Sequence, residues 1–212
     1  MLFENVNKIL MIQKITIEGY KSIKEQTVEL FPINILIGGN GIGKSNFISA
    51  FTLIHNLYER NLQNYVLTKG GSDSLLYMGK KETDHLSFDL FFAERGKDAH
   101  NRFIVNMKEA QDSLFIERID TAYHNGVSWH KQLHEVNKQE SSFKNDHTGQ
   151  AFYVNSFLRE FEVYHFHDTG DRSPMKGKCN MDDNVSLKNN GANIAAFLYL
   201  SLIHISEPTR RT

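Results

Sequence analysis

The stretch Gly38-Gly39-Asn40-Gly41-Ile42-Gly43-Lys44-Ser45 fits the pattern G-x-x-x-x-G-K-[ST], which is typical of loops that hold the phosphates of a nucleotide. An apolar, β-branched run at residues 33–37 precedes it and predicts a buried strand. Apolar residues at helical spacing from Asn46 to Arg60 predict a helix directly after it. The order strand, glycine-rich loop, helix is the context in which this motif binds phosphate, and an incidental glycine-rich turn is the weaker alternative.

The residue types in this loop have chemical reasons. Glycines permit positive φ and close approach of the backbone, so that N–H groups surround a phosphate at a helix N-terminus. We predict that Lys44 reaches the β- and γ-phosphates and that the Ser45 hydroxyl is a ligand of Mg²⁺. The predicted ligands are ATP and Mg²⁺, and the predicted nucleotide-binding residues here are Gly38, Gly39, Asn40, Gly41, Ile42, Gly43, Lys44, Ser45 and Asn46.

Composition sets the broad class. The chain has 212 residues, 40% hydrophobic and 23% charged, with a formal net charge of -1, so a buried core is expected and no global charge points to a nucleic acid or a membrane. Its single cysteine, Cys179, excludes an internal disulfide and suits the cytoplasm. No apolar run reaches the roughly 18 residues of a membrane span, and the N-terminus lacks the features of a secretory signal.

Hydrophobic periodicity predicts most of the remaining elements. Alternating residues predict a hairpin of strands at 15–18 and 27–30, and an antiparallel meander of strands at 85–91, 102–107 and 113–119. Residues 1–10 are interpreted as a lead-in, and the polar residues 124–149 as a surface excursion. The later predictions are a helix at 150–161, a strand at 163–166, a loop at 168–183 and an apolar helix at 192–205.

Two segments resemble the N-terminus of ABC-type ATPases of the RecF/SMC kind, in particular bacterial RecF-like AAA family ATPases. They are Ile15-x-Ile17-x-Gly19-Tyr20-Lys21-Ser22-Ile23 and residues 35–46, with one Asn inside the loop and another after Ser45. The resemblance extends over about residues 11–200. It implies an α/β fold, the N-terminal lobe of a P-loop NTPase (ABC/SMC-like) with an antiparallel β-subdomain. It also implies that Lys21 and Ser22 lie near the nucleotide, although Lys21 is equally well explained as a solvated turn residue.

The resemblance implies a function as well. It implies an ATPase that hydrolyses ATP with Mg²⁺ in a composite homodimer site, with Lys44 as a catalytic residue, acting in DNA repair, DNA maintenance or phage defence, with DNA as a further partner. One alternative is an ATP-gated binding or scaffold protein without appreciable hydrolysis, and another is a small-molecule kinase. The glutamine that contacts Mg²⁺ in such proteins has no clear counterpart here, with Gln63 and Gln111 as candidates.

The chain lacks parts of a complete hydrolytic site. No apolar strand ending in Asp-Glu follows Lys44, and the Ser-Gly-rich signature motif is absent. Residues 200–210 resemble a translated sequencing-library adapter. We therefore expect the native part of this chain to stop near Tyr199, with the C-terminal half of the protein lost and residues 201–212 non-native. Residues 11–200 are then expected to be an incomplete lobe that is poorly soluble and nearly inactive alone.

Two smaller clusters have simpler interpretations. His165, His167, Asp168 and Cys179 do not have the spacing of a closed zinc site, so a polar surface role is favoured over a metal. Arg172, Lys176 and Lys178 are favoured as a solvated loop over a contact to a DNA backbone.

Overall fold

The computed structural model of the chain describes residues 10–94, 100–159, 161–164, 166, 170 and 173–206. The chain divides into two compact units, residues 1–161 and 162–212, and each is described by itself. Among the described residues, the first unit contains all the strands and three α-helices: β1 (Leu10–Tyr20), β2 (Ile23–Glu29), α1 (Lys44–Tyr58), α2 (Leu62–Thr68), β3 (His85–Glu94), β4 (His100–Ala110), β5 (Ser113–His124), β6 (Trp129–Lys138) and α3 (Gly149–Leu158).

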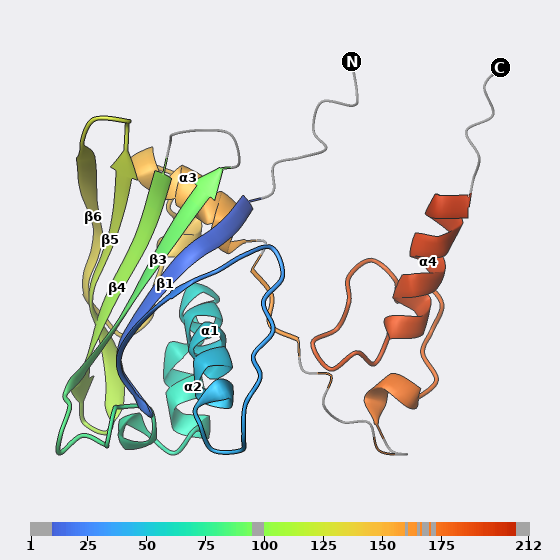
Figure 1. Ribbon diagram of the computed structural model, residues 1–212, viewed down its shortest axis with the longest axis horizontal. Coiled ribbons are helices and arrows are strands. Elements are labelled where there is room, and N and C mark those ends of the chain that lie inside the picture. Colours follow the sequence, from blue (N-terminus) through green and yellow to red (C-terminus); the bar gives the residue numbers. More distant parts are fainter. Residues whose placement is uncertain are drawn as a thin grey trace. The chain divides into compact units, whose positions relative to one another are not determined.

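The strands form one six-stranded antiparallel sheet in the order β2-β1-β3-β4-β5-β6 (Figure 1). The predicted hairpin is confirmed, because β1 pairs with β2. The predicted meander is also confirmed, because β3 pairs with β4 and β4 pairs with β5. Residues 44–58 form α1, which confirms the helix predicted after the loop. Together these elements give an α/β chain with an antiparallel sheet.

One face of the sheet carries the core. Ile17 of β1 pairs with Phe88 of β3, Phe88 pairs with Val105 of β4, and all three side chains are fully buried. Because paired residues project to the same side of a sheet, alternate residues of each strand line this face. The helices contact the sheet here, α1 at β1, α2 at β5, and α3 at β4 and β5. Each fully buried Leu, Ile or Phe contributes roughly 1.5–3 kcal/mol to folding, so the apolar spacing that predicted these elements also accounts for their packing.

The buried strand predicted at residues 33–37 is wrong. These residues form no strand, and Ile33, Ile35 and Ile37 are 82%, 77% and 86% exposed. A strand needs a neighbour to receive its backbone hydrogen bonds, and every described strand pairs only with the others of the antiparallel sheet. Apolar composition predicts that a segment favours burial, but it does not supply the partner that buries it.

Two later predictions also need correction. Residues 129–138, interpreted as part of a polar surface excursion, form the edge strand β6. The strand predicted at 163–166 is wrong for its described residues, since Val163, Tyr164 and Phe166 form no strand, and His165 lies outside the described residues. In β6 only Glu135 is buried. The strand therefore has almost none of the alternation between buried apolar and exposed polar residues by which strands are recognised in a sequence.

The second unit contains α4 (Ile194–Ser206) and a short 3₁₀ helix (Pro174–Lys176), so the predicted apolar helix is confirmed. The buried side chain of Asn193 organises the loop before α4, because its amide donates to the carbonyls of Asp183 and Ser186 (both 2.8 Å) and accepts from the N–H of Lys188 (2.8 Å). Among the described residues, no helix has the length and apolar character needed to cross a membrane.

Candidate nucleotide-binding site

The glycine-rich loop ends where α1 begins. Gly43 precedes the first helical residue, Lys44, and has φ +99°, while Gly41 has φ +82°. Side chains other than glycine rarely adopt this left-handed region. The first internal hydrogen bond of α1 runs from the N–H of Phe47 to the carbonyl of Gly43 (2.9 Å), so the N–H groups of Lys44, Ser45 and Asn46 have no acceptor within the helix. These N–H groups are available to an anion.

The Lys44 side chain folds back over the loop. Its ammonium donates hydrogen bonds to the carbonyl oxygens of Gly38 (2.7 Å) and Gly39 (2.5 Å). Ile42 packs against Gly38 so closely that a Cβ at Gly38 would overlap its Cδ1 atom. A positive charge is therefore held directly over the loop, by acceptors that a phosphate can replace.

The turn between β1 and β2 is joined to α1 by two hydrogen bonds. The side-chain amide of Asn46 donates to the Ser22 hydroxyl (2.8 Å), and the Lys21 ammonium donates to the Ser49 hydroxyl (3.1 Å). Ser22 also touches the loop, since a Cβ at Gly43 would lie 3.3 Å from its Oγ. Ser22 thus lies beside the predicted loop residues, whereas the ammonium of Lys21 is bonded one helical turn further along α1.

Burial changes the pKa values in this cluster. Burial, with a smaller contribution from the nearby charge of Lys69, lowers the pKa of Lys21. The neighbouring Tyr20 hydroxyl, which is hydrogen-bonded to Ser49 (2.9 Å), has its pKa raised by burial. Both shifts favour neutral groups, as expected where the turn packs against α1.

Two pockets meet at the start of α1. One, of about 340 Å³, is lined by loop residues only: Asn40, Gly41, Gly43, Lys44, Ser45 and Asn46. The other, of about 360 Å³, lies between the loop and β2 and shares Gly43 and Lys44 with the first. A phosphate chain fits the first pocket by chemistry, because it offers helix N-terminal N–H groups, an ammonium and the Ser45 hydroxyl. The space beside Gly41 is open, because a Cβ added there would meet no atom within 4 Å.

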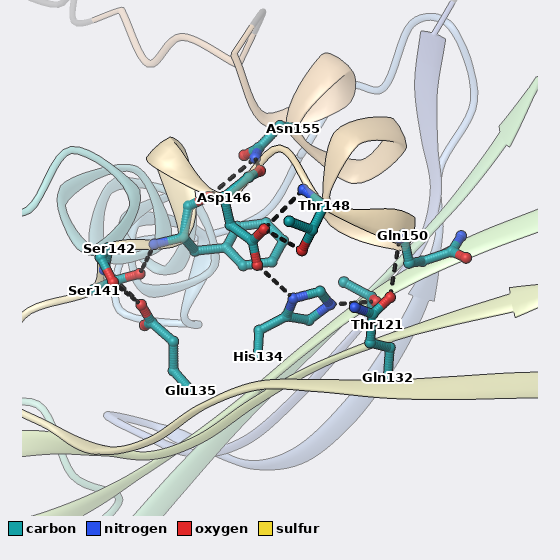
Figure 2. Close-up of polar contacts among 11 residues, drawn as sticks. Thr121, Gln132, His134, Glu135, Ser141, Ser142, Asp146, Thr148, Gln150 and Asn155 are labelled. Atoms are coloured by element: carbon teal, nitrogen blue, oxygen red, sulfur yellow. Dashed lines mark hydrogen bonds and ion pairs between the residues drawn. The ribbon is translucent and has the colours of Figure 1, made fainter.

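The structure also contains a polar network that the sequence did not predict (Figure 2). His134 of β6 lies between Thr121 of β5 and Asp146, with its Nε2 2.8 Å from the Thr121 hydroxyl and its Nδ1 2.8 Å from the Asp146 carboxylate. The order hydroxyl, imidazole, carboxylate is that of a hydrolytic triad. However, Thr121 is fully buried and the His134 side chain is 1% exposed.

This buried network is structural. Asp146 also accepts from the N–H and hydroxyl of Thr148 (2.9 and 2.6 Å), and Gln132 accepts from the N–H of Gln150 (3.0 Å). These bonds attach the start of α3 to β5 and β6, as Figure 2 shows. No sequence motif signals the network, because its residues come from separate segments and meet only after the sheet has formed.

The remaining sequence candidates do not join the loop. The Gln63 side chain donates to the carbonyls of Leu114 (2.7 Å) and Gln139 (2.8 Å), so it joins α2 to β5, and Gln111 lies in the β4–β5 turn with φ +52°. His165, His167, Asp168 and Arg172 lie outside the described residues, while Lys176 and Lys178 are exposed. Within the described part of the chain, no group of three His, Cys, Asp or Glu side chains could hold a metal ion.

Comparison with known proteins places the chain in a family. None of the curated proteins matches it. The AAA ATPase domain matches residues 11–197, a span that contains the loop, the first turn of α1, the β1–β2 turn and nearly the whole sheet. The chain therefore belongs to the AAA ATPase domain family, and is an AAA-type ATPase by that membership.

Proposed function

We propose that the chain binds ATP with Mg²⁺ at residues 38–46 and that the intact protein hydrolyses it. The observation that carries this is the position of the Lys44 ammonium, which lies 2.7 Å from the carbonyl oxygen of Gly38 and 2.5 Å from that of Gly39. When ATP binds, the ammonium would leave these two carbonyls and contact the β- and γ-phosphates. Ser45, in the first turn of α1, would hold Mg²⁺ through its hydroxyl. Bound Mg²⁺ would neutralise the negative charge that develops on the phosphates while the terminal phosphoryl group is transferred to water.

The finer class that we propose is RecF/SMC-like, with a second copy of the chain completing the site. Its support is that the two segments that carry the resemblance contact each other, through the hydrogen bond between Ser22 and Asn46. In this class the output would be DNA repair, DNA maintenance or phage defence.

A second candidate function is an ATP-gated scaffold without appreciable hydrolysis. One observation favours it: among the described residues, no carboxylate forms a hydrogen bond or ion pair with Lys44 or Ser45. Hydrolysis needs an acidic group for the metal and a residue that orients the attacking water. Nucleotide binding needs neither of them.

The test is release of phosphate from ATP by the intact protein, with and without Mg²⁺, beside ATP-dependent dimerisation measured by sedimentation. Magnesium-dependent release that Lys44→Ala abolishes supports hydrolysis. Dimerisation with ATP but no release supports the scaffold. Release that Lys44→Ala leaves unchanged contradicts a role for this loop in turnover.

A further inference from the structure

The proposed phosphate site leaves one adjacent pocket, the pocket between the loop and β2, without an assigned ligand group. It is contiguous with the loop pocket through Gly43 and Lys44, and its volume is about 360 Å³. A nucleotide whose phosphates lie on the loop must place its base in some neighbouring space, and this pocket is directly adjacent. A role for the pocket in holding the base rests on the proposed function of the loop and extends it.

The pocket has apolar walls suited to a flat ring. Val28 of β2, Leu36 and Ile42 of the loop segment, and Phe47 of α1 line it together. Val28 and Phe47 pack against the buried core, so these two walls are fixed by the fold. Ligand pockets commonly combine such apolar walls with a few polar groups that set orientation.

Gln26 supplies a polar group to this pocket. It pairs with Ile17 in the β1–β2 ladder, and Ile17 is fully buried on the face that the helices cover. Because paired residues project to the same side, the Gln26 side chain lies on that side too, and it lines the pocket. Its carboxamide forms no hydrogen bond with another described residue. Thr27, the next residue, projects to the opposite face and bonds to Thr16 (2.9 Å).

We propose that Gln26 selects adenine as the base of the bound nucleotide. A carboxamide pairs with the exocyclic amine and N7 of adenine, as one donor and one acceptor. Guanine offers two acceptors at that edge, O6 and N7, so the carboxamide oxygen is left facing an acceptor. Gln26 is therefore a specificity-determining residue, and the chain binds ATP in preference to GTP.

The experiment is displacement of a ribose-labelled fluorescent ATP from the full chain by four probes. They are ATP, GTP, 7-deaza-ATP, which lacks N7, and tripolyphosphate, which lacks a base. We expect ATP to bind about tenfold more tightly than GTP or 7-deaza-ATP. In Gln26→Ala the three nucleotides should bind alike, with the affinity for tripolyphosphate unchanged. Thr27→Ser, on the opposite face of the same strand, should behave as the wild type.

The outcomes separate this inference from the function on which it rests. If the wild type binds ATP and GTP equally, or if Gln26→Ala keeps the preference for ATP, the role of Gln26 is overturned while triphosphate binding stands. If neither ATP nor tripolyphosphate binds, or if Lys44→Ala binds both as the wild type does, the proposed function itself fails. Gln26 is exposed on β2, so replacing it should not affect folding, which circular dichroism checks.

Discussion

The hydroxyl of Ser22, in the turn between β1 and β2, accepts a hydrogen bond of 2.8 Å from the side-chain amide of Asn46, in the first turn of α1. This bond joins the sheet to the helix that begins at the glycine-rich loop. Ser22 also lies against Gly43, the residue immediately before that helix. This contact is therefore one of those that position the loop relative to the sheet.

Breaking the Ser22–Asn46 bond should weaken nucleotide binding. A hydrogen bond of this type contributes about 0.5–1.5 kcal/mol, so Ser22→Ala or Asn46→Ala should each lower the affinity for ATP by about two- to tenfold. If the loss of this bond is the cause, the double variant should bind ATP no more weakly than the single variant with the lower affinity. Affinities from titration calorimetry of all four proteins test this, and strictly additive losses would contradict it.

Gly43→Ala should destabilise the chain, because alanine would be forced to φ +99° with its Cβ 3.3 Å from the Ser22 hydroxyl. The left-handed region costs a non-glycine residue roughly 1–2 kcal/mol. Gly39→Ala is the matched control, since its φ is not in that region and its Cβ would meet nothing within 4 Å. Urea unfolding should show a loss only for Gly43→Ala, and equal losses would argue against this loop geometry.

Asp146 should make the first unit sensitive to acid. Burial alone would raise the pKa of Asp146, but its hydrogen bonds with Thr148 and His134 outweigh burial and lower it. A carboxyl group whose pKa is lower in the folded chain stabilises the fold above the unfolded value, about 3.9. That stability is lost as pH falls through the lower, folded pKa.

Asp146→Asn should therefore lower the free energy of unfolding at neutral pH and reduce its decline on acidification. Glu117→Gln, an exposed carboxylate on β5, is the control and should change neither. Urea unfolding at a series of pH values measures both effects. An acid decline as steep in Asp146→Asn as in the wild type would show that other groups cause it.

The exposed side chains of Ile33, Ile35 and Ile37 should promote self-association, because a row of apolar residues on an unpaired segment favours contact between copies. Replacing all three by Thr should reduce light scattering of the concentrated chain without lowering its melting temperature. Ile17→Thr is the opposite case, since Ile17 is fully buried and its replacement should cost about 2–4 kcal/mol. A large destabilisation by the triple substitution would contradict the exposure of this segment.

Sequence reasoning succeeded where the pattern depends on local structure. The alternation around Ile17, Phe88 and Val105 predicted strands because each has one buried face. Spacing likewise predicted α1, whose buried residues are Ala50, Leu53, Ile54, Leu57 and Tyr58. The loop motif predicts a nucleotide-binding site from residues that are contiguous in sequence, and that site stays a prediction.

Sequence reasoning failed where the outcome depends on a partner elsewhere in space. Residues 33–37 are as apolar as a buried strand, but no described strand pairs with them. The edge strand β6 is polar along most of its length, and its pairing with β5 defines it. The link between Thr121, His134 and Asp146 has no sequence signature, since strand pairing brings them together.

The most direct test of the central claim is the equilibrium affinity for ATP with Mg²⁺ of the chain and two lysine variants. We predict that the wild type and Lys81→Ala, which removes an exposed lysine that lines neither pocket at the loop, bind ATP alike. Lys44→Ala should bind at least about tenfold more weakly, as expected for the loss of a hydrogen bond to a charged group. Equal binding by Lys44→Ala, or no binding by the wild type, would contradict the account.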